Sequence, residues 1–281
     1  MKNIILAIKG FFIGLANIIP GVSGGTLALT LGIYEKLIGC ISHFFKNLKE
    51  NIKFILPIGI GAVIAILTSS HLISFCLDNY VLPTILFFIG AILGGLPMLI
   101  KKVSGHKITI SNIIIFLITF GIIILLLFLN SETEVSFQNM NIIDYLLLFV
   151  VGVVASATMV IPGVSGSAVL MTIGYYKPIL NIVKNLTDFS SLGSNLAILI
   201  PFGLGVLVGI LLIAKLLEFL FKNFEVKTYY GVLGFIVASI IAIIYQNLVI
   251  NANFVFSFGS LIIGIILFIL GFVVAYKLGD K

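Results

Sequence analysis

The chain has 281 residues, of which 60% are hydrophobic and only 9% are charged, whereas soluble domains average roughly 25% charged residues. This composition excludes an ordinary soluble fold and indicates a polypeptide that crosses a membrane several times. The net charge of +6 comes from lysines alone, since the chain has no arginine. Loop lysines that fix membrane topology explain it better than nucleic-acid binding does.

The first predicted element is a helical hairpin over residues 4–42. Its apolar arms, residues 4–19 and 26–42, flank the run Pro-Gly-Val-Ser-Gly-Gly at residues 20–25. The arms have 16 and 17 residues, and a helix of that length covers roughly 25 Å, less than a hydrocarbon core of roughly 30 Å. We therefore expect a re-entrant hairpin with the Pro/Gly break at its tip, and two tilted spans are the alternative. The first arm resembles a signal peptide, but no small-x-small cleavage site follows it, so we expect it to be retained.

Three apolar spans follow this hairpin, and the same order then repeats. The spans of the first half cover residues 54–77, 83–100 and 111–129. The second half has a hairpin over residues 145–183, with arms 145–161 and 167–183, and spans at 196–221, 229–247 and 257–276. The sequence thus predicts an all-α polytopic membrane protein with one transmembrane domain over residues 1–281, built from repeat 1 at 1–129 and repeat 2 at 142–281.

Lysines mark one side of this topology. Cytoplasmic loops are enriched in lysine, and the lysine-rich segments here alternate with segments that carry acidic residues or no charge. The lysines that set the pattern are Lys2, Lys9, Lys36, Lys46, Lys49, Lys53, Lys101, Lys102, Lys107, Lys222, Lys227, Lys277 and Lys281. Lys184 opposes it, because it lies in a loop predicted to be outside. We expect both termini to be cytoplasmic.

The Pro/Gly/Ser break occurs at the same place in both halves, as Pro20 to Gly25 and as Pro162 to Ser167. Between residues 17–38 and 159–180, nine of 22 aligned positions are identical. An odd number of spans per half inverts the second copy, and the number stays odd if each hairpin is replaced by two spans. Inverted repeats that meet at broken helices are typical of secondary transporters, whose site lies near the midplane.

The duplicated break has the chemistry of an anion site. Non-helical backbone at membrane depth is tolerated only when it is buried or lines a wet cavity. The second arm of each hairpin begins with good capping residues, and helix starts offer free N–H groups to anions. The candidate phosphate-binding residues are Asn17, Gly21, Ser23, Gly24, Gly25, Thr26, Gly163, Ser165, Gly166 and Ser167. A structural alternative is that Pro-Gly only turns the hairpin, but two copies with the same Ser spacing favour binding.

A few charged and aromatic residues border the apolar segments. Charges within a membrane are functional candidates, and the candidates for coupling or gating are Tyr34, Glu35, Lys36, Tyr176 and Lys177. The alternative is that these charges reach the interface. We expect Lys215 and Glu218, spaced i and i+3, to pair on one helix face, and His71 to pack or to lie at the interface.

The sequence contains no recognisable catalytic constellation. Cys40 and Cys76 lack metal-ligand spacing, and Gly-Val-Ser-Gly-Gly is not a hydrolase elbow because no strand precedes it. We therefore expect a transporter rather than an enzyme, without a metal or cofactor.

The run from Asn17 to Thr26, followed by Gly-Ile-Tyr-Glu at 32–35, resembles the signature of a prokaryotic family of polyprenyl-phosphate (undecaprenyl-phosphate) translocases. The second copy, with Gly174 and Tyr176, resembles the second signature of that family. The resemblance implies a plasma-membrane flippase that returns undecaprenyl phosphate from the outer to the inner leaflet for cell-wall synthesis. It also implies two opposed re-entrant hairpins, and a polyprenyl phosphate and membrane lipids as partners.

Two other functions are compatible with the residues themselves. A small-anion channel or exchanger would use the paired broken helices in the same way, and a scaffold for cell-envelope enzymes would not need them. A homo-oligomer is compatible with the sequence, and no nucleic-acid partner is expected.

Overall fold

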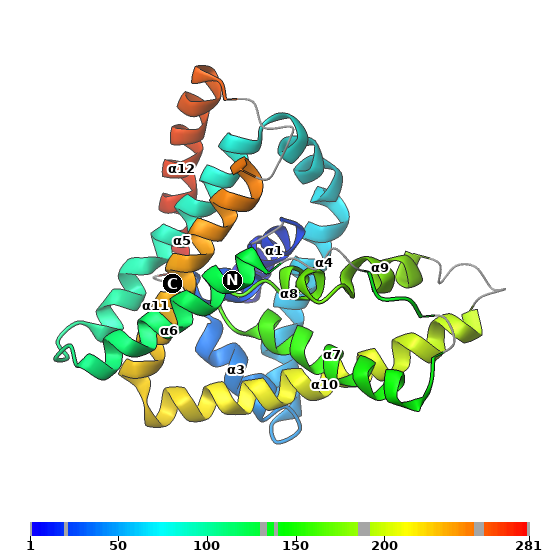
Figure 1. The fold of residues 1–281 in the computed structure, drawn as a ribbon. Helices are drawn as coiled ribbons and strands as arrows, with labels where there is room; N and C mark the ends of the chain where they lie inside the picture. The colour runs from blue at the N-terminus through cyan, green and yellow to red at the C-terminus, as the bar shows by residue number, and fades with distance from the viewer. Residues whose placement is uncertain are drawn as a thin grey trace.

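The computed structural model describes residues 2–19, 22–129, 134–137, 140–184, 192–249 and 256–279. Over these ranges the chain forms helices joined by turns and no strand, as Figure 1 shows. The all-α class expected from the sequence is confirmed.

The helices follow the same order in both halves of the chain. The first half contains α1 (Lys2–Ile18), α2 (Gly24–Thr30), α3 (Tyr34–Ser42), α4 (Leu48–Asn79), α5 (Val81–Val103) and α6 (Ile110–Phe128). The second half contains α7 (Ile142–Val160), α8 (Gly166–Thr172), α9 (Tyr176–Lys184), α10 (Leu192–Asn223), α11 (Glu225–Ile244), continued by the π-helical turn η2 (Tyr245–Val249), and α12 (Phe258–Gly279).

Seven of the described helices are long and apolar enough to cross a membrane, namely α4, α5, α6, α7, α10, α11 with η2, and α12. The protein is therefore a multi-pass membrane protein. Four of the six expected spans lie within one of these helices, and the spans 111–129 and 257–276 extend one residue beyond α6 and α12. The helix α7 is the seventh. The helix α7 starts before the expected arm at 145–161 because Asn141 and Asp144 form a capping box, in which each side chain accepts from the other residue's backbone N–H.

The second arm of each hairpin is two short helices rather than the single helix expected from the sequence. Gly32 separates α2 from α3 with a φ of +71°, and Gly174 separates α8 from α9 with a φ of +76°. This left-handed conformation suits glycine, which has no Cβ to clash with the backbone. The repeated glycines therefore mark a second break in each half, about two helical turns beyond the Pro/Gly motif.

The long helices pack in four pairs, α1 with α4, α7 with α10, α5 with α12, and α6 with α11, and the last three pairs lie side by side in Figure 1. Glycines allow this close approach: a Cβ added at Gly61, Gly90 or Gly205 would lie 2.0–2.1 Å from a carbonyl oxygen of the paired helix. Small residues at such positions are the usual basis of helix association in membranes.

The last helix of each half packs against the other half. The helix α6 of the first half lies on α11, and α12 of the second half lies on α5. In addition, α3 packs against α10. The two halves are thus interlocked, and their broken segments face a common interior.

Candidate functional site

The two broken motifs touch each other. The Gly163 N–H donates to Thr26 Oγ1 at 2.6 Å, and the Tyr34 hydroxyl donates to the Val160 carbonyl at 2.8 Å. Gly25 lies against the same end of α7, since an added Cβ would be 3.0 Å from Val160 O. The start of α2 and the end of α7 therefore form one junction, contributed by both halves of the chain.

Ser23 supplies an unpaired hydroxyl next to this junction. It is the residue before α2, is 5% exposed, and makes no side-chain capping bond. Its Oγ has no hydrogen-bond partner among the described residues. A buried hydroxyl without a partner costs about 1–3 kcal/mol, so Ser23 offers a donor that a bound oxyanion would satisfy.

The other candidates of the first motif surround Ser23. An added Cβ at Gly24 would lie 2.7 Å from Asn17 Oδ1, so the exposed Asn17 amide reaches the first turn of α2. Thr26 is buried and serves as the acceptor for Gly163. The expected site residue Gly21 lies outside the described residues.

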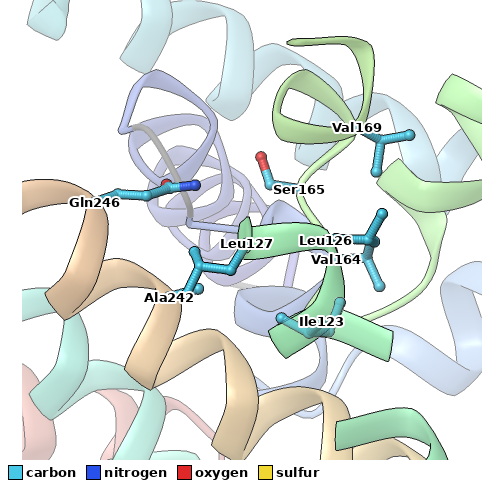
Figure 2. A pocket seen from close by; sticks show the side chains of 9 residues that line it. Ile123, Leu126, Leu127, Val164, Ser165, Val169, Ala242 and Gln246 are labelled. Carbon is cyan, nitrogen blue, oxygen red and sulfur yellow. The ribbon is translucent and has the colours of Figure 1, made fainter. Parts of the chain in front are cut away.

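The second motif is arranged differently. Ser165 Oγ and Ser167 Oγ lie 3.0 Å apart, and Ser165 lines a small pocket of about 30 Å³ with Gln246. Figure 2 shows these two polar side chains among apolar residues of α6, α11 and the second motif. Gly166 packs under Met159 and does not line this pocket. The two serines that align in sequence therefore have unequal environments, since Ser23 is buried and Ser165 faces a pocket.

One of the expected coupling residues, Glu35, belongs to a polar cluster beside the first motif. Glu35 Oε1 lies 3.1 Å from Lys102 Nζ, which lies 3.6 Å from Glu225 Oε1, and the Tyr229 hydroxyl donates to Glu35. This cluster joins α3, α5 and α11. Tyr34 reaches the motif junction instead, through Val160.

The remaining coupling candidates do not join that cluster. Lys36 Nζ lies 4.5 Å from the ring centroid of Phe54. Lys177, at the position that corresponds to Glu35, forms an exposed ion pair with Glu134 at 2.8 Å. Tyr176 lies beside Lys177 at the start of α9. Tyr34, Glu35 and Lys36 nevertheless line one cavity together with Lys102 and Tyr229, whereas Tyr176 and Lys177 lie on α9.

The expected pair of Lys215 with Glu218 is wrong. Glu218 Oε2 accepts from the Ser42 hydroxyl and lies 3.2 Å from His43 Nδ1. The reason is tertiary: α3 packs against α10 and brings these two side chains to Glu218. His71 is exposed on α4, and within the described ranges no group of three or more His, Cys, Asp or Glu residues could hold a metal.

Lys9 is a polar residue whose role the sequence did not indicate. Counted above with the topology-setting lysines, it is only 3% exposed, and its ammonium donates to Leu31 O at 2.7 Å. Leu31 directly precedes the Gly32 break. Its position within an apolar arm was the available signal, because a lysine there is not simply a loop residue.

Comparison with known sequences identifies the family of the chain. Residues 13–262 match the family described as undecaprenyl phosphate translocase-like. The chain belongs to this family. A polyprenyl-phosphate transporter of Staphylococcus aureus (strain NCTC 8325 / PS 47) is 32% identical over 277 residues, which cover 97% of this chain and 94% of that protein.

A second relative is a polyprenyl-phosphate transporter of Vibrio cholerae serotype O1 (strain ATCC 39315 / El Tor Inaba N16961). It is 28% identical over 232 residues, which cover 78% of this chain and 70% of that protein. No solved structure matches. The family is one of transporters and not of enzymes, as the sequence predicted.

Proposed function

We propose that this protein moves a polyprenyl phosphate across the plasma membrane. As a flippase it returns undecaprenyl phosphate from the outer to the inner leaflet, where the carrier lipid re-enters cell-envelope synthesis. The observation that carries the proposal is the buried, unpaired Ser23 hydroxyl beside the Thr26–Gly163 contact, where both broken motifs meet. The names of the two relatives support the choice of cargo.

The chemistry of the junction suits a phosphate headgroup. The chain has no arginine, so a planar bidentate clamp is absent, and hydroxyl, amide and backbone N–H donors must hold the anion. Ser23 and Asn17 supply such donors on the first motif, and Ser165, Ser167 and Gln246 supply them on the second. The polyprenyl tail stays in lipid, so that only the headgroup requires a polar path.

We further propose that the two halves are inverted repeats with cytoplasmic termini. The contact of Ser42 with Glu218 places the beginning of α4 near the end of α10, and the Lys102–Glu225 pair places the end of α5 near the beginning of α11. Corresponding helices therefore run in opposite directions. The lysine-rich ends of these helices favour the cytoplasmic side for this contact region.

Transport of the lipid can be tested at Ser23. In a strain without a redundant transporter, Ser23→Ala should slow the return of undecaprenyl phosphate about tenfold, because a hydrogen bond to a charged group contributes about 1.5–3 kcal/mol. The measurement is the amount of undecaprenyl phosphate exposed on the outer face. Ser104→Ala, at an exposed position after α5, should behave as wild type. An unchanged outer pool in a well-expressed Ser23→Ala strain contradicts the proposal.

A small-anion channel or exchanger is the second candidate, and the pocket that contains Ser165 and Gln246 favours it. Purified protein in liposomes should then conduct a small anion, and Ser165→Ala should reduce the flux. Lipid transport without anion flux contradicts this alternative.

A further inference from the structure

A second polar cavity lies away from the motif junction, between α10 and the turn that follows α3. It has a volume of about 760 Å³, is open to the surface, and is the place where three lysines from two segments converge, Lys46 on the turn and Lys215 and Lys222 on α10. None of the residues that line the motif pocket beside Ser165 lines this cavity. The proposed transport pathway at the junction therefore does not account for it.

The cavity carries uncompensated positive charge. Within the described part of the chain, none of its three lysines forms an ion pair, whereas Glu218, the one carboxylate that lines it, is already bound by Ser42 and His43. Three ammonium groups and one carboxylate leave a charge of about +2 with His43 neutral. An anion would find free donors here.

Apolar side chains line the cavity beside the lysines. Leu211, Lys215 and Phe219 follow one another at intervals of four residues, which places them in a row along one face of α10. Leu211 lies about 6 Å further into the span than Lys215. On the facing turn, Phe44 and Phe45 pack edge to face, and Phe45 is 81% exposed. The cavity thus combines cationic and apolar side chains, and Leu211 lies deeper in the span than Lys215 and Lys222.

We propose that this cavity binds the phosphate monoester headgroup of a lipid at the lysine-rich surface of the membrane, with the first part of the apolar chain along Leu211 and Phe219. The inference rests on the proposed function for the direction in which lipid passes, and it makes the cavity a separate headgroup site on the cytoplasmic leaflet. A free phosphate would use the lysines but would leave the apolar side chains unused.

The chain has no tryptophan, which allows a single-tryptophan reporter. Phe219→Trp in a nanodisc of neutral lipid should change its fluorescence saturably when farnesyl phosphate is added. The exposed position of Phe45 supplies a second reporter, Phe45→Trp, if the first folds poorly. With either reporter, Lys215→Gln combined with Lys222→Gln should weaken binding at least tenfold, while Lys49→Gln, outside the cavity at the same end of the molecule, should leave it unchanged.

Three results would overturn the inference: an equal response to farnesol, an equal affinity for inorganic phosphate, or unchanged binding in the double lysine variant. Ser23→Ala separates the two proposals. It should slow lipid transport and leave the fluorescence titration unchanged, and loss of the titration in this variant would assign the signal to the junction instead. Binding that persists in a protein without transport would sink the proposed function alone.

Discussion

At the scale of single residues, the contact between Thr26 and Gly163 holds the two motifs together. Thr26→Val keeps the side-chain shape but removes the acceptor of the Gly163 N–H, and an unsatisfied buried N–H costs about 1–3 kcal/mol. We expect a lower unfolding temperature in detergent and slower lipid transport for Thr26→Val. Thr26→Ser retains the hydroxyl and should stay close to wild type; equal stability of the two variants contradicts the assignment.

Lys9 allows a different test, because its substitution should reduce transport without lowering the stability of the fold. Its buried ammonium donates to the Leu31 carbonyl beside the Gly32 break, and a buried charge contributes little to stability even when it is paired. Lys9→Met should therefore leave the unfolding temperature unchanged or higher, and should reduce transport several-fold by releasing α1 from that break. A loss of stability without a transport defect at permissive temperature would make Lys9 purely structural.

The sequence could predict which residues matter at the motifs, but not how they pair. Repetition identified Ser23, Thr26 and Ser165 as candidates. The Thr26–Gly163 bond joins residues 137 positions apart, and no local pattern specifies such a contact. The same limit explains why the predicted partner of Glu218 is wrong. The i,i+3 spacing predicted an ion pair with Lys215, but tertiary packing brings His43 to Glu218 instead.

At the scale of helices, glycines decide how closely the paired helices approach. The helix α4 contains two glycines, Gly59 and Gly61, that can be compared directly. A Cβ at Gly61 would lie 2.0 Å from Ala7 O, whereas a Cβ at Gly59 would meet nothing within 4 Å. Gly61→Ala should destabilise the fold by about 1–3 kcal/mol through overpacking. Gly59→Ala should be neutral or stabilising by up to about 1 kcal/mol, because alanine favours helix.

Thermal unfolding of the two alanine variants in the same detergent measures this difference. Equal unfolding temperatures would mean that α1 and α4 do not pack through Gly61. Helix spans themselves follow from the sequence, since each predicted span lies within one helix or extends beyond it by one residue. The packing of α6 and α12 against the other half does not follow from the sequence, because several glycine-bearing spans offer alternative pairings that only the assembled core distinguishes.

At the scale of the whole molecule, the two halves differ in how their hairpins are held. The helix α3 packs against α10, whereas no comparable packing joins α9, the corresponding helix, to α4 within the described residues. The Glu35–Lys102–Glu225 cluster adds polar contacts at the α3 side. Under the proposed function, this asymmetry corresponds to a conformation of an alternating-access transporter that is closed on the α3 side.

The Glu35–Lys102 contact should therefore stabilise the closed α3 side, and the chain contains a reporter for it. Cys40 is buried on α3, so in a Cys76→Ser background its rate of labelling by a membrane-permeant maleimide reports opening. Partly exposed ion pairs contribute up to about 1 kcal/mol each, so Lys102→Gln, which removes two, should raise the rate roughly 3- to 10-fold. Lys101→Gln is the matched control, since the neighbouring lysine forms no ion pair in the described chain. Equal labelling rates in the two variants would show that the cluster does not hold the α3 side closed.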